Sequence, residues 1–190
     1  MNFLHKLFLL FLILPFCIHS QNNFSLVNDS INKQKFSEIS LVKNLRKYRG
    51  RNTLLFECNN KQQIKYSDDE SDENYVKFEE LGKFKKNIVV IQKTDYNSEK
   101  YILLDTINCR QIILDGLPLK INDEEKYIVF NNPGTDEKYK LEVLEFRSDF
   151  FEISNTIIFP NEILPKRILK VSNKEVYVLD KENKIWKTTL

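Results

Sequence analysis

Four short runs of apolar residues between residues 87 and 130 constrain the fold of this chain more than any other feature. They are Asn-Ile-Val-Val-Ile, Tyr-Ile-Leu-Leu-Asp, Gln-Ile-Ile-Leu-Asp and Tyr-Ile-Val-Phe, at residues 87–91, 101–105, 111–115 and 127–130. Clusters of Asn, Asp, Gly and Lys separate these runs, and this pattern is typical of antiparallel strands joined by short turns. The sequence therefore predicts an antiparallel meander at the centre of the chain.

The same pattern extends over the remaining sequence from residue 51 onward. With the four runs above it predicts about a dozen strands, the others at residues 53–58, 63–67, 75–81, 140–146, 150–159, 168–171, 176–180 and 185–188. The chain has 190 residues, of which 42% are hydrophobic, enough for one globular core. We therefore expect an all-β fold, mainly an antiparallel meander, with residues 51–190 as a single β-rich domain.

One short helix is predicted before this domain, at residues 38–49. Ser37 lies at its N-cap position, and Gly50 can end it. Apolar residues recur every three positions on one face, at Ile39, Val42, Leu45 and Tyr48. The alternative is a strand, because Ile39 and Leu41 also alternate with polar residues. The preceding residues 21–34 are polar and rich in Asn, so we expect a poorly ordered leader, and residues 21–50 then form a leader and a short helix.

Residues 1–20 have the features of a secretory signal peptide. Lys6 precedes an unbroken apolar run at residues 7–14, Pro15 follows it, and Ser20 offers a small residue for cleavage. The apolar stretch is shorter than the ~20 residues that span a bilayer. We therefore predict cleavage after Ser20 and a secreted or periplasmic protein with no membrane span. The alternatives are an uncleaved anchor and a lipoprotein signal at Cys17.

Cleavage after Ser20 would remove both histidines, His5 and His19. The mature chain would then lack the imidazole that Ser-His-Asp catalysis and His-ligated zinc require. Lys6 is the only charged residue that is lost, so 28 of the 29 basic residues remain with all 27 acidic residues. A net charge of +1 gives no electrostatic reason to expect nucleic acid as a partner.

The two segments at residues 101–105 and 176–180 form a weak internal repeat. Tyr-Ile-Leu-Leu-Asp corresponds to Val-Tyr-Val-Leu-Asp, and each is followed by a polar turn and an apolar pair. With residues 112–117 and 122–130, the first copy resembles the β-propeller repeats of exported bacterial proteins. The resemblance implies blades of antiparallel strands but no particular activity. A dozen strands make about three blades, so an open propeller-like array, a sandwich and a barrel all stay open.

Cys58 and Cys109 are the only cysteines beyond residue 20. An even number in an oxidising compartment favours a disulfide, and two separate buried thiols are the alternative. The acidic residues 68–73 lack the glycine and the spacing of a calcium loop, so we expect a solvated loop there. Gly82 and Gly116 are isolated and Gly134 follows a proline, so none of them predicts a phosphate-binding loop.

No catalytic residues, cofactor site or metal site are predicted. Asp105, Asp115 and Asp180 are interpreted as turn formers, and the aromatic residues, Trp186 among them, as core. We therefore expect an exported module that binds a protein or glycan of the cell envelope without catalysis. A carboxylate-dependent hydrolase and an inhibitor-like or structural envelope protein are the alternatives.

Overall fold

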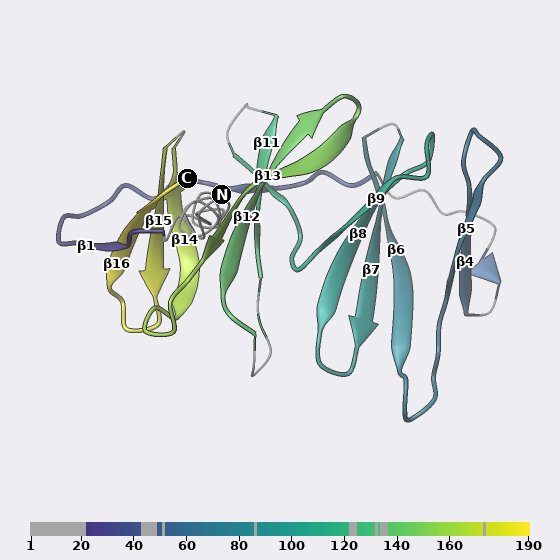
Figure 1. The fold of residues 1–190 in the computed structure, drawn as a ribbon, viewed down its shortest axis with the longest axis horizontal. Coiled ribbons are helices and arrows are strands. Elements are labelled where there is room, and N and C mark those ends of the chain that lie inside the picture. The colour runs from purple at the N-terminus through teal and green to yellow at the C-terminus, as the bar shows by residue number, and fades with distance from the viewer. Residues whose placement is uncertain are drawn as a thin grey trace, which may run out of the picture.

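Four antiparallel sheets stand side by side along the long axis of the molecule in a computed structural model (Figure 1). The structure describes residues 22–42, 49–50, 52–85, 87–121, 125–131, 133, 137–172 and 174–190. These residues contain strands and turns and no helix. The predicted all-β antiparallel class is therefore confirmed for the described part of the chain, whereas the signal peptide at residues 1–20 lies outside it.

We number the sheets first to fourth in their order along the molecule. The first contains β3 (Arg49–Gly50), β4 (Thr53–Glu57) and β5 (Gln63–Ser67). The second contains β6 (Val76–Lys85), β7 (Ile88–Asp95), β8 (Glu99–Asp105) and β9 (Gln111–Leu114). Consecutive strands are neighbours in both sheets, as expected of a meander.

The third and fourth sheets each include a strand from the N-terminal part of the chain. The third has the order β13-β12-β11-β10-β2, with β10 (Leu119–Lys120), β11 (Lys126–Phe130), β12 (Lys140–Arg147), β13 (Phe150–Ile158) and β2 (Ser37–Glu38). The fourth has the order β1-β16-β15-β14, with β1 (Ser25–Val27), β14 (Pro165–Val171), β15 (Glu175–Asp180) and β16 (Ile185–Thr189). Every strand predicted between residues 53 and 188 overlaps an observed strand.

Three hydrophobic cores fill the spaces between successive sheets. Val89 and Ile91 of β7 belong to the core shared with the first sheet, whereas Ile88 and Val90 belong to the core shared with the third. All four side chains are at most 1% exposed. Because alternate side chains of a strand point to opposite faces, a strand between two sheets is apolar at every position. This explains the continuous apolar run at residues 88–91.

The N-terminal residues run along the fourth, third and second sheets, as the purple to blue trace in Figure 1 shows. We call residues 22–42 the crossing segment. Its β1 pairs with β16, Gln34 bonds β14 at the carbonyl oxygen of Leu169, and β2 pairs with β10. Val42 then bridges Lys83 of β6, and β3 pairs with β4 after the segment ends. Ser25–Val27 and Gln34, which lie among the residues for which we expected poor order, thus pair with the fourth sheet.

The helix predicted at residues 38–49 is not observed in the described residues. Glu38 lies in β2, Ile39 is buried in the core between the second and third sheets, and Val42 makes a β-bridge. Residues 43–48 lie outside the described part. Ile39 and Leu41 lie outside the assigned strands, and both side chains pack into the same core. Backbone hydrogen bonds to strands that are distant in sequence replace the local hydrogen bonds that a helix would form.

Gly82 allows the crossing segment to approach β6. The amide N–H groups of Val42 and Lys83 donate to each other's carbonyl oxygens at 2.8 and 2.9 Å. A Cβ atom on Gly82 would lie 2.9 Å from the carbonyl oxygen of Val42, and its φ is 143°. A side chain would therefore be strained by its backbone conformation and would clash with the crossing segment.

Candidate functional site

A cavity of about 280 Å³ lies between the third and fourth sheets. Polar and charged side chains line much of it: Lys126, Glu145, Arg147, Ser154, Asn155 and Ser172. The apolar remainder is Ile121, Val143 and Leu190. Strands β11, β12 and β13 supply one wall, and residues beyond the ends of β14 and β16 supply the other. The size and mixed lining suit a small polar group rather than a large ligand.

A β-bulge in strand β13 shapes this cavity. Val143 pairs with Asn155, but the next residue of β12, Leu144, pairs with Ile153. Ser154 is therefore the extra residue, and its hydroxyl donates to the carbonyl oxygen of Val143 at 3.2 Å. A bulge bends its strand and increases the local twist. Here it brings Ser154 and Asn155 to the cavity together.

Beyond the bulge, the tip of the β12–β13 hairpin leans toward the second sheet (Figure 1). The Phe151 ring lies 5.6 Å from the Phe84 ring of β6, between ring centroids. Arg110, which precedes β9, lies over the Phe150 ring and donates to the carbonyl oxygen of Ser148. The tip is thus held against the second sheet, while the cavity lies on the side that faces the fourth.

The charges in the cavity are held by ordinary ion pairing. Nε of Arg147 donates to Oε2 of Glu145 at 2.8 Å, and Nη2 donates to the same oxygen. Lys126 is the register partner of Glu145 on the neighbouring strand. Two basic residues and one acidic residue are therefore among the described residues that line the cavity. The Arg147 side chain is 59% exposed, so solvent and ligands can reach its remaining N–H donors.

Strand β13 also has an open edge. It is the last strand in the order of its sheet, and no described residue pairs with its outer side. Two of its aliphatic side chains are exposed, Ile153 by 41% and Ile158 by 54%. An unpaired strand edge with exposed aliphatic residues is a template for pairing with another chain.

Cys58 and Cys109 form a disulfide, as one of the two sequence hypotheses predicted. Their Cα atoms lie 5.7 Å apart, within the usual range for a bridge. Cys58 starts the turn after β4 and Cys109 lies in the turn after β8, so the bond joins the first sheet to the second. The amide of Asn59 also donates to the carbonyl oxygen of Thr106 at 3.3 Å. The two cysteines therefore have a structural role.

Asp105 and Asp180 are buried and close equivalent hairpins, as expected of turn formers. Each is 3% exposed or less. The carboxylate of Asp105 accepts bonds from the amide of Ile107 and from Arg110. That of Asp180 accepts bonds from the amide of Lys184 and, at 2.7 Å, from Nε1 of Trp186. These carboxylates serve the fold, and Trp186 packs into the core between the third and fourth sheets.

Asp115 lies in an ion cluster between the second and third sheets. Lys100 lies 3.2 Å from its Oδ1, and Lys140 bonds its Oδ2 and, at 2.9 Å, Oε1 of Glu142. Burial alone would raise the pKa of Asp115, but hydrogen bonds and charges from Lys140 and Lys100 outweigh it and lower that pKa. Burial likewise opposes the charged form of Lys140, but the carboxylates raise its pKa. Both ions are therefore held in their charged forms.

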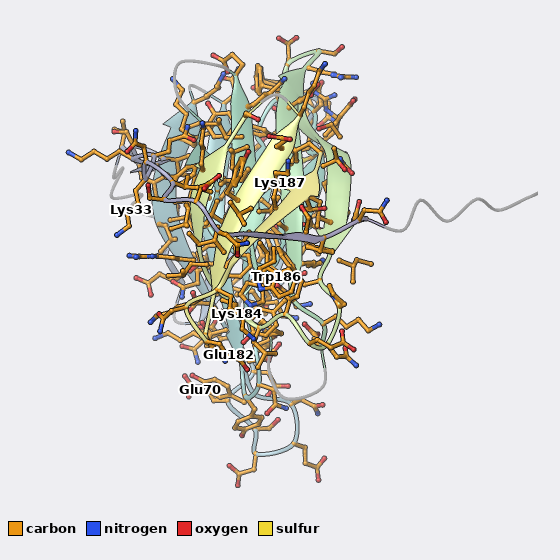
Figure 2. All side chains as sticks on the ribbon, turned by 90° about the vertical axis from the view of Figure 1, so that its left-hand side faces the viewer. Lys33, Glu70, Glu182, Lys184, Trp186 and Lys187 are labelled. Atoms are coloured by element: carbon orange, nitrogen blue, oxygen red, sulfur yellow. A yellow bond between two sulfur atoms is a disulfide. The ribbon has the colours of Figure 1, made fainter. Side chains whose placement is uncertain are left out.

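Asp115 and Glu142 share the ammonium group of Lys140, and neither lines the cavity. Glu142 is 6% exposed, and no described residue bonds its Oε2. Paired carboxylates of a glycosidase must flank a substrate, whereas these flank Lys140. The acidic residues 69–73 are exposed, with Glu70 at the lower end of the view in Figure 2. In the described residues, no His, Cys, Asp or Glu side chains are grouped for metal binding.

Sequence reasoning missed the cavity residues Lys126, Arg147, Ser154 and Asn155. One signal was present: Ser-Asn-Thr, together with Glu152, interrupts the mainly apolar run at residues 150–159. No described helix is long and apolar enough to cross a bilayer. Comparisons with protein-family models and with curated proteins gave no match.

Proposed function

We propose that this protein is an exported interaction module that binds an extended segment of another protein along strand β13. The proposal places it outside the cytoplasm, because residues 1–20 have the pattern of a secretory signal and a disulfide is favoured in an oxidising compartment. The binding mode is strand addition, in which backbone hydrogen bonds supply affinity and side-chain contacts supply selectivity.

The open edge of β13 is the observation that carries this proposal. In the fourth sheet the crossing segment already adds a strand in this way, because β1 pairs with the outer side of β16. In the third sheet the last strand is β13, which has nine residues, and no described strand pairs with its outer side. Native proteins usually protect such edges with charges, prolines or bulges. Strand β13 has the bulge at Ser154 and the exposed Glu152, but Ile153 and Ile158 are also exposed on it.

For the finer architecture we propose an open, propeller-like array. Its support is the repeated hairpin that ends in a buried Asp, with β8 and β9 in the second sheet and β15 and β16 in the fourth. An array of this kind presents strand edges and loops on its outer surface. This arrangement would leave β13 accessible to a partner chain.

Selection from a displayed library of random decapeptides tests the function. We expect the exported protein to select peptides, and the double variant Ile153→Lys, Ile158→Lys to bind them at least about tenfold more weakly, because charges block edge pairing. Leu55→Lys is the matched control, since Leu55 is 45% exposed on the first sheet. Equal loss in the control, or no selected peptide at all, would contradict the proposal.

A further inference from the structure

Cross-strand neighbours in the third sheet form a row of charged residues that ends at the open edge of β13. Lys126 of β11 is the register partner of Glu145 of β12, and Glu145 is the register partner of Glu152 of β13. Directly opposed residues of neighbouring strands lie on the same face of a sheet. The row therefore contains one basic and two acidic residues, and its last member, Glu152, lies on the outermost strand.

The two carboxylates of this row differ in what they bond. Glu145 has a counter-ion, because Nε of Arg147 donates to its Oε2 at 2.8 Å and Nη2 donates to the same oxygen. Glu152 is exposed, and no ion pair or side-chain hydrogen bond joins it to any described residue. Like charges directly opposite each other destabilise a pair of strands. The edge thus presents an unpaired carboxylate whose cross-strand neighbour has the same charge, so a cation is missing on its outer side.

Alternation decides what an added strand would place beside Glu152. A strand that adds to β13, as the proposed function requires, would continue the charged row with one residue opposite Glu152. The next residue of the added strand would lie opposite Ile153 on the other face, where Ile153 is 41% exposed. Ile153 pairs with Leu144, which is buried in the core between the second and third sheets. Consecutive residues of the added strand would therefore meet an acidic position and an apolar position.

We infer that Glu152 selects a partner strand with a basic residue, Lys or Arg, opposite it and an aliphatic residue opposite Ile153. The inference rests on the proposed function, because it needs a strand at this edge. The added cation pairs with Glu152 and offsets its repulsion by Glu145. A charged edge residue usually protects a strand against pairing. At β13 the same carboxylate rejects acidic strands and accepts basic ones, so it gives the edge selectivity as well as protection.

Three synthetic heptapeptides with blocked ends and the sequence Thr-Thr-Val-X-Val-Thr-Thr, where X is Lys, Gln or Glu, test the inference by fluorescence anisotropy with the exported protein. We expect the Lys peptide to bind about threefold more tightly than the Gln peptide, as an exposed ion pair allows, and the Glu peptide to bind most weakly. The preference should shrink in ~1 M salt, where the Debye length is about 3 Å. Glu152→Lys keeps one charge at this position and should reverse the order of the three peptides.

The control for net charge is Glu57→Lys, at an exposed position of β4 at the other end of the molecule (Figure 1). It should preserve the preference for the Lys peptide, whereas Glu152→Gln should bring the Lys peptide to the level of the Gln peptide. If the Lys peptide binds Glu152→Gln as tightly as the unsubstituted protein, Glu152 only protects the edge and the inference is overturned. Equal binding of the three peptides also overturns it and leaves strand addition intact. No binding of any peptide overturns strand addition and, with it, the inference.

Discussion

The turn after β4 (residues 58–62) and the turn after β15 (residues 180–184) have the same backbone at opposite ends of the molecule. In both, the amide of the first residue donates to the carbonyl oxygen of the fifth at 2.9 Å. The fourth residue, Lys61 or Asn183, donates back to the first and has a φ of 64°. The first residue, Cys58 or Asp180, is 3% exposed. The two turns differ in what that first side chain bonds.

Cys58 bonds a different sheet, whereas Asp180 bonds its own hairpin. The disulfide with Cys109 ties the first sheet to the second. The Asp180 carboxylate holds the amide of Lys184 and the indole of Trp186, which lies on the sheet nearest the viewer in Figure 2. The backbone of the turn is thus independent of its first residue, and that residue decides which elements are joined. The covalent bond occurs at the first sheet, which has three short strands and one neighbouring sheet.

Removal of the disulfide should have the largest effect. For a separation of 51 residues, the chain-entropy model gives about 4 kcal/mol as an upper value, and we expect a loss of about 2–4 kcal/mol. The double variant Cys58→Ser, Cys109→Ser should show this loss in guanidinium denaturation without reductant. The first sheet should lose amide-exchange protection before the others, because it packs against one neighbour only.

The matched control is guanidinium denaturation of the unsubstituted protein with and without reductant. Reduction should lower its stability toward that of the double variant and leave the variant unchanged. An equal unfolding midpoint for the oxidised protein and the variant would show that the disulfide does not stabilise the first sheet.

Replacement of Asp180 should have the next largest effect, at the opposite end of the molecule. Asp180→Ala leaves the indole N–H of Trp186 and the amide of Lys184 without their carboxylate acceptor, which should cost about 2 kcal/mol. Trp186 is the only tryptophan in the chain, so its fluorescence reports on this turn directly. We expect a red shift of its emission maximum in the folded variant.

Asp180→Asn is the control, because the amide keeps one oxygen that can accept a bond. It should lose less stability than Asp180→Ala. An unchanged emission maximum in Asp180→Ala would refute the role of this carboxylate in holding the indole. Neither variant should change protection in the first sheet, since Asp180 bonds only its own hairpin.

The sequence predicted the elements whose bonds are local, and it failed where bonding is distant. The strands from residue 53 onward, except the two-residue β10, were predicted because each pairs with a neighbour in the chain and is separated from it by turn residues. Strand β2 was predicted as the start of a helix, because Ile39 and Val42 also fit a helical period. Its partner β10 begins at Leu119, and no local pattern reveals a pairing over that separation.

The candidate site could be predicted from the sequence only in fragments. The pairing of Cys58 with Cys109 was one of two alternatives, because the turns that bring them together follow strands of different sheets. The cavity depends on the register shift at Ser154, which is a property of two paired strands. Arg147 lies on β12 and Lys126 lies on β11, where it is the register partner of Glu145. The two residues are separated in sequence, so neither stood out as a site residue.

A smaller effect is expected at the ion cluster between the second and third sheets, and it should depend on pH. The lysines hold the pKa of Asp115 below its ordinary value of 3.8. The stabilisation is therefore complete above the unfolded pKa and is lost as the pH falls through the folded pKa. Asp115→Asn should cost about 1 kcal/mol at pH 7 and flatten the decline in stability below about pH 4. Denaturation curves at several pH values measure both the loss of stability at pH 7 and the slope of its decline in acid.

That pH dependence distinguishes the contribution of the ion cluster from that of the disulfide. The stabilisation by the disulfide does not titrate in acid, so the double cysteine variant should keep the same acid-dependent decline as the unsubstituted protein. If Asp115→Asn declined as steeply as the unsubstituted protein between pH 4 and pH 2, the ion cluster would not be the source of this acid sensitivity.

The smallest change in stability is expected for substitutions of the fourth residue of each turn. Lys61 and Asn183 have the same φ of 64°, but a left-handed backbone costs lysine more than asparagine, whose short side chain can bond locally. Glycine adopts this conformation freely but loses more entropy on folding. We therefore expect Lys61→Gly to stabilise the protein by about 0.5 kcal/mol and Asn183→Gly to change it by less. Thermal unfolding of both variants under identical conditions gives the comparison. Because the two backbones match, a larger gain for Asn183→Gly would mean that contacts beyond the backbone determine the stability of these turns.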